Sequence, residues 1–91
     1  MKKNTLTMPI PDALGGETEQ IVKFIFVENS SNVYAVGWDQ SGNMYVSFHG
    51  GGTYLYYGVS RQRAVAAAYA KSVGQYINRK IKPYFEVLKL G

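Results

Sequence analysis

Residues 33–57 read VYAVGWDQSGNMYVSFHGGGTYLYY and contain three short β-rich segments separated by two turn sequences. In residues 44–48 the side chains alternate, which places Met44, Val46 and Phe48 on one face of a strand. Residues 39–43 and 50–52 are rich in residues that tolerate tight turns and positive φ. The stretch therefore predicts three consecutive strands, at residues 33–38, 44–48 and 53–57, joined by hairpin turns.

A further strand is predicted upstream, at residues 21–27. This run, IVKFIFV, is almost entirely apolar, which is typical of a strand that is covered on both sides or held at an interface. Residues 1–17 contain two prolines and the pair Gly15-Gly16 without a clear period, so we expect a flexible or irregular N-terminal arm. A chain of 91 residues can bury one core, which predicts a single domain over residues 18–91.

Two helices are predicted after the strands. Ser60 is a suitable N-cap for an alanine-rich helix over about residues 61–70. Ser72 and Gln75 have capping-box spacing at the start of a second, amphipathic helix, which Pro83 ends. Residues 84–90 are compatible with a short last strand or an extended segment. The predicted fold is α+β, with an antiparallel β-meander of about four strands followed by a helical hairpin and a possible short C-terminal strand.

The composition argues against several classes of function. The absence of Cys excludes thiol chemistry and disulfides, and a single His makes a dedicated metal site unexpected. The acidic residues are sparse and scattered, so no paired acid and base is expected, and we predict no catalytic residue and no cofactor. No apolar run approaches the roughly 18 residues of a membrane span. A soluble, cytoplasmic protein that does not associate with membranes is expected.

The positive charge is concentrated in the C-terminal third. Up to residue 60, three basic residues stand against five acidic ones, a net charge of −2. From residue 61 onward, seven basic residues stand against Glu86 alone, a net charge of +6. This asymmetry favours a partner that carries phosphates or another acidic surface.

Three segments occur in a fixed order: SSNVYAVGWD, then Tyr54-Leu55-Tyr56, then SVGQYINRKIKPY. Together they resemble the KTSC domain, which is found at the C-terminus of some lysyl-tRNA synthetases and as a stand-alone protein in bacteria and phages. The resemblance spans roughly residues 27–84. The chain departs from the family pattern at Trp38, where Tyr is usual, and at Ser60, where Pro is frequent. The resemblance implies RNA binding through the synthetase context.

The candidate phosphate-binding residues are the basic side chains of the two predicted helices: Arg61, Arg63, Lys71, Arg79, Lys80 and Lys82. We expect them to form one shared cationic patch. For the residues at the end of the second helix the alternative is structural, because the helix macrodipole favours cations there whatever the protein does. Phosphate contacts would supply affinity and register but little sequence discrimination.

The candidate stacking or pocket residues are aromatic, with one amide from the family motif: Trp38, Tyr54, Tyr56, Tyr57, Tyr76 and Asn78. Tyr54 and Tyr56 alternate onto one strand face, where they could stack on bases as in single-strand binders. In the structural alternative, that face lies under the helices. Tyr57 and Trp38 would then be the stacking pair, on the other face.

Three functions remain open. The first is a non-enzymatic module that binds RNA or single-stranded nucleic acid. The second is a phage-type anti-defence sponge, in which a basic residue, the loop at residues 50–52 and an aromatic side chain sequester a cyclic nucleotide between protomers. The third is a protein-interaction subunit with IVKFIFV as an exposed edge and the alanine-rich helix packed on a partner. We expect a homo-oligomer in each case.

Overall fold

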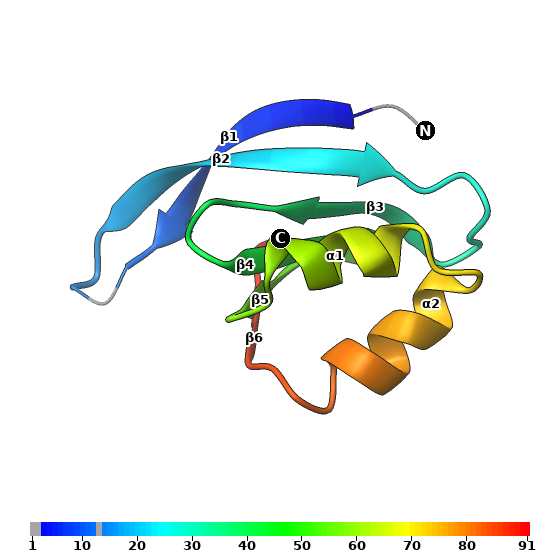
Figure 1. Ribbon diagram of the computed structural model, residues 1–91. Helices are drawn as coiled ribbons and strands as arrows, with labels where there is room; N and C mark the ends of the chain where they lie inside the picture. Colours follow the sequence, from blue (N-terminus) through cyan, green and yellow to red (C-terminus); the bar gives the residue numbers. More distant parts are fainter. Residues whose placement is uncertain (1–2, 13) are drawn as a thin grey trace.

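A computed structural model describes residues 3–12 and 14–91, and its main feature is one curled, six-stranded antiparallel sheet (Figure 1). The strands follow each other in space in chain order: β1 (Lys3–Pro11), β2 (Glu17–Phe26), β3 (Val33–Trp38), β4 (Asn43–Phe48), β5 (Gly52–Tyr57) and β6 (Val87–Lys89). Gly42 and Gly50 take positive φ in the turns before β4 and β5, as the turn sequences predict. The three predicted strands at the centre of the chain are confirmed.

The helices are short and lie on one side of the sheet (Figure 1). The first, α1 (Arg61–Ala68), contacts β3 and β4. The second, α2 (Val73–Tyr76), continues into a single π-helical turn, η1 (Ile77–Ile81). The two predicted N-caps are confirmed, because the Ser60 Oγ accepts a hydrogen bond from the Arg63 amide (3.2 Å) and the Ser72 Oγ accepts one from the Gln75 amide (3.4 Å).

The prediction of a four-stranded meander followed by a helical hairpin is wrong. The sheet has six strands, and the helical part consists of two short helices rather than two full-length antiparallel ones. Residues 3–11 of the predicted arm form β1, which pairs with β2 along its whole length. The tail supplies β6. Pro9 and Pro11 argue against an interior strand, but proline is tolerated on an edge strand, where β1 lies.

The IVKFIFV segment is not the exposed edge strand that the protein-interaction hypothesis expected. It belongs to β2, which is flanked by β1 and β3 and therefore has no free edge. Val22 and Ile25 of the segment are buried within the same molecule, whereas Ile21 remains 60% exposed. The segment does not supply the exposed edge that the protein-interaction hypothesis required.

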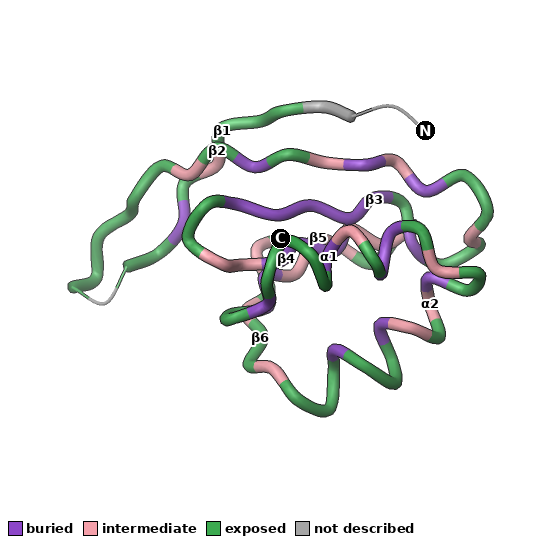
Figure 2. Tube along the Cα trace, in the orientation of Figure 1, coloured by how far each residue is buried: buried purple, intermediate pink, exposed green. Residues whose placement is uncertain are grey.

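The two faces of the sheet carry separate apolar clusters. Buried positions run along most of β3 and recur along the helical segments (Figure 2). On the helical side, Trp38, Met44 and Tyr56 lie opposite each other on β3, β4 and β5 and pack with residues of α1, α2 and η1. The face turned away from the helices has a smaller buried cluster, which contains Ile10, Val22, Tyr45 and Leu55. The curled sheet therefore stabilises itself on one face and holds the helices on the other.

No helix in the described part of the chain is both long enough and apolar enough to cross a bilayer. Within residues 3–12 and 14–91, no group of three or more His, Asp or Glu side chains is placed to hold a metal ion.

Candidate nucleic-acid interface

The six predicted basic side chains are all exposed, and they come from α1, η1 and the segments that flank them. No acidic residue occurs between residues 61 and 85. The side chains do not gather in the single patch that we expected. They divide among three hollows, with Arg63 set apart, because α1 and the α2–η1 segment run in different directions over the sheet (Figure 1).

The first hollow, of about 520 Å³, contains three of the cations. Lys71 from the loop after α1 and Arg79 and Lys80 from η1 line it together with Tyr76. Tyr69, which is 55% exposed, lines a neighbouring hollow together with Lys71 and the acidic Glu28. Cations and an accessible aromatic ring are therefore close together at this end of the helical layer.

The second hollow, of about 480 Å³, brings Lys82 next to the aromatic side chains of β4 and β5. The Lys82 ammonium lies 5.6 Å from the centre of the Phe48 ring, and the Lys89 ammonium lies 6.0 Å from the centre of the Tyr54 ring. Gly51 also lines this hollow. Arg63 is placed elsewhere, with its guanidinium 5.9 Å from the centre of the Phe85 ring.

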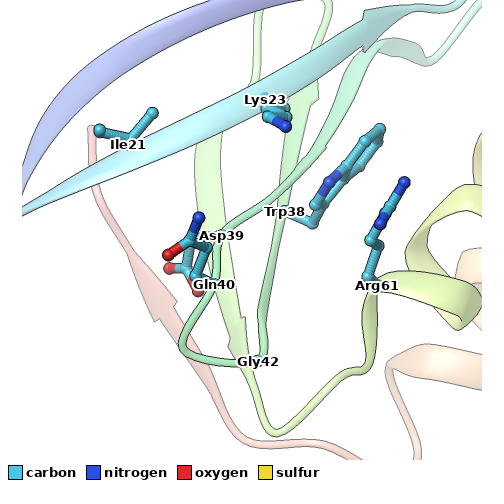
Figure 3. A pocket seen from close by; sticks show the side chains of 7 residues that line it. All are labelled: Ile21, Lys23, Trp38, Asp39, Gln40, Gly42 and Arg61. Atoms are coloured by element: carbon cyan, nitrogen blue, oxygen red, sulfur yellow. The ribbon is translucent and has the colours of Figure 1, made fainter.

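The third hollow is a cavity of about 300 Å³ between β2, the end of β3 and the start of α1 (Figure 3). Lys23 and Arg61 lie on either side of the Trp38 indole, and the exposed Gln40 also contributes to the lining. Lys23 was not among the predicted site residues. Its signal in the sequence is that it is the one charged residue in the apolar run IVKFIFV.

The turn below this cavity is held by the buried Asp39. One carboxylate oxygen accepts hydrogen bonds from the amides of Ser41 (2.8 Å) and Asn43 (3.2 Å). The other accepts from the Asn43 side chain (3.1 Å) and the Tyr45 hydroxyl (2.6 Å). Burial, together with the bond to Asp39, raises the pKa of Tyr45 far above its ordinary value. The turn that carries Gln40 and Gly42 is therefore fixed by four hydrogen bonds.

The predicted stacking residues have mixed positions. Tyr54 and Tyr56 lie under the helices: Tyr56 is buried, which raises its pKa, and Tyr54 is half-buried and packs edge-on against Phe48 at 5.7 Å. Trp38 shares that face with Tyr56, so it cannot form the predicted pair with Tyr57, which is exposed on the opposite face.

The two remaining candidates are on the α2–η1 segment. Tyr76 is half-buried against the core, at the rim of the first hollow, and Asn78 is exposed. The more accessible aromatic rings of the helical layer are Tyr69 and, after η1, Tyr84, which is 72% exposed. Sequence reasoning assigned a role to neither: Tyr69 lies outside the alternating and family segments, and Tyr84 is the last residue of the segment SVGQYINRKIKPY but was not singled out.

A comparison with known protein families shows which family this chain belongs to. The KTSC domain matches residues 29–85, which include β3, β4, β5 and all of the helical segment. The chain belongs to the KTSC family. The crystal structure of a KTSC domain protein from Yersinia pestis is similar, with a TM-score of 0.69 and 28% sequence identity over 77% of this chain and 99% of that one. No curated protein matches.

The KTSC match starts after β2, so β1 and β2 lie outside it. Two of the hollows are built from residues within the match or close to its C-terminal end. The cavity beside Trp38 is different, because Ile21 and Lys23 of β2 complete a wall that the matched segment does not provide.

Proposed function

We propose that this KTSC protein is a non-enzymatic module that binds RNA or single-stranded nucleic acid along its helical layer. The observation that carries the proposal is the set of six exposed cations between residues 61 and 82, in a segment without a single acidic residue. The helix macrodipole explains Arg79, Lys80 and Lys82, which lie at the C-terminal end of η1, but not Arg61, Arg63 and Lys71. A surface with this excess of charge attracts a polyanion.

The division into several hollows supports a strand that runs over the layer rather than a single compact contact. Each exposed cation that neutralises a phosphate releases a counterion, which supplies affinity without reading sequence. Tyr69 and Tyr84 add accessible rings among the cations. A base stacked on such a ring contributes roughly 1–3 kcal/mol, and every base can do so. The proposal is therefore binding with weak sequence preference.

The test compares two variants with the same net charge. Arg79→Ala/Lys80→Ala removes two cations from the helical layer, and Thr5→Glu/Thr7→Glu lowers the charge equally through exposed positions of β1, away from the helices. We expect the first variant to weaken binding of a labelled oligouridine about tenfold or more, because two phosphate contacts are lost, and the second to have a much smaller effect. Equal losses in both variants, or no binding by the unmodified protein, would contradict the proposal.

A second candidate function has one specific observation in its favour. The hollow beside Lys82 combines that cation with Gly51 of the glycine loop and the rings of Phe48 and Tyr54, which is the type of lining expected for a nucleotide sponge. Native mass spectrometry of the purified protein tests this alternative. Stoichiometric nucleotide in an oligomer would favour the sponge, whereas a nucleotide-free protein that binds oligouridine would favour the first function.

The protein-interaction alternative loses the two features that suggested it. β2 is an interior strand, and the alanines at positions 64, 67 and 68 of α1 are buried against the chain's own sheet. The small side chains of α1 allow it to approach β3 closely, so the fold accounts for them without a partner.

A further inference from the structure

The cavity between β2, the end of β3 and the start of α1 is separate from the hollows where the other helical cations lie. Three segments contribute to its lining: the strand that carries Lys23, the turn that carries Gln40, and the start of α1 at Arg61 (Figure 3). The indole of Trp38, which is only 5% exposed, also lines the cavity and lies between the two cations. Segments that are far apart in the sequence therefore build one concave, positively charged site.

The lining keeps an excess of positive charge. Its acidic residue is Asp39, whose buried carboxylate accepts four hydrogen bonds from its own turn and from Tyr45, so Lys23, Arg61 and Asp39 together give the lining a formal charge of +1. Lys23 and Arg61 are both exposed and line the same cavity, on either side of the Trp38 indole (Figure 3). Two like charges that line one cavity repel each other, and a bound anion would remove this repulsion.

Helix stability does not account for the position of Arg61. The first turn of α1 carries Arg61 and Arg63 and no acidic residue. The macrodipole favours acidic residues there and disfavours cations. Arg79 and Lys80, at the other end of a helical segment, have the opposite relation to the dipole. Arg61 therefore has no structural explanation of the kind that applies to Arg79 and Lys80.

We infer that this cavity binds a phosphate monoester, and that in the proposed function, on which this inference rests, the monoester is the terminal phosphate of the nucleic-acid strand. A terminal phosphate carries a charge of about −1.5 to −2 at neutral pH, which matches two cations better than the single charge of an internal phosphodiester. A compact hollow of about 300 Å³ suits a strand end, because a terminal phosphate needs a path for the strand on one side only. The side-chain amide of Gln40 adds an uncharged donor.

The experiment measures the affinity of the full chain for one oligouridine with a 5′-phosphate, a 3′-phosphate or neither. We expect at least one phosphorylated form to bind about tenfold more tightly than the unphosphorylated form. Lys23→Ala and Arg61→Ala should each remove most of this difference. Both side chains are exposed, so the variants should fold, which circular dichroism and thermal unfolding can verify. The control is Lys71→Ala, which should weaken the binding of all three oligonucleotides by a similar factor and leave the ratio of their affinities unchanged.

The outcomes separate the cavity from the wider function. Equal affinity for the three oligonucleotides would overturn the inference and leave the proposed function intact. The inference would also be overturned if Lys71→Ala reduced the affinity difference between phosphorylated and unphosphorylated oligouridine as much as Lys23→Ala does. Adenosine monophosphate and inorganic phosphate are tested alone. One outcome would contradict both claims: a small phosphate compound binds, its binding requires Lys23 and Arg61, and none of the oligonucleotides binds. In that case the phosphate does not come from a strand end, and the proposed function fails.

Discussion

Asp39 links the turn between β3 and β4 to the cluster on the sheet face turned away from the helices. Its carboxylate is buried and accepts four hydrogen bonds, of which the shortest comes from Tyr45 at 2.6 Å. A buried carboxylate that loses a donor keeps its desolvation cost but not the compensation. The same turn forms one wall of the cavity between Lys23 and Arg61. This residue pair therefore supports both stability and the geometry of the site.

We expect Tyr45→Phe to lower the free energy of unfolding by about 1–3 kcal/mol, because Asp39 loses one of its four donors while the ring remains in place. Urea denaturation followed by tryptophan fluorescence measures the change. Tyr57→Phe is the matched control, since Tyr57 is 38% exposed and its hydroxyl can be solvated; it should alter stability by less than about 0.5 kcal/mol. Similar effects of the two substitutions would contradict the role assigned to Asp39.

The raised pKa of Tyr45 predicts a loss of stability at high pH. In the unfolded chain this tyrosine ionises near its ordinary value of about 10, whereas in the folded protein it stays protonated to higher pH. The unfolded state therefore binds fewer protons above about pH 10, and stability falls as pH rises through that value. Urea denaturation between about pH 9 and pH 11 should show a steeper fall for the unmodified protein than for Tyr45→Phe. Parallel curves would show that Tyr45 is not the group responsible.

At the scale of the elements, local sequence determined the centre of the fold but not its edges. The strands at residues 33–57 could be predicted because alternation and turn chemistry agree there. β1 was not predicted, because its two prolines resemble an arm. Its sequence does alternate, with Leu6, Met8 and Ile10 at every second position, and this strand signal was outweighed although proline is tolerated on an edge strand. The short π-helical turn of η1 was not predicted either; Ile77 and Ile81, at its two ends, are both buried in the core.

The assignment of β1 as part of the sheet gives a direct prediction. Ile10 is 5% exposed and packs with Val22 in the cluster turned away from the helices, so Ile10→Ala should lower the free energy of unfolding by about 2 kcal/mol or more. Leu6→Ala, at a position on the same strand that is 53% exposed, should have a much smaller effect. If neither substitution changes the urea midpoint, residues 3–11 behave as the arm that the sequence suggested.

At the scale of the whole molecule, the sequence identified the cations but not how they are grouped. Charge asymmetry is visible in the chain, whereas the division among three hollows depends on how α1 and η1 cross the sheet. Lys23 joins Arg61 only because β2 pairs with β3, with Lys23 opposite Trp38. Tyr54 and Tyr56 seemed suited to stacking from their alternation, but which face the helices cover is a tertiary property.

The central claim is that exposed cations of the helical layer contact the phosphates of a nucleic-acid strand, and the salt dependence of binding tests it most directly. The affinity for single-stranded oligouridine is measured by fluorescence anisotropy over a series of salt concentrations. The logarithm of the binding constant should fall linearly with the logarithm of the salt concentration, by about 0.7 for each phosphate contact. Arg79→Ala/Lys80→Ala should make the slope shallower by about 1.4, which corresponds to two lost contacts. A binding constant that does not change with salt, or a slope that the double substitution leaves unaltered, would contradict the account.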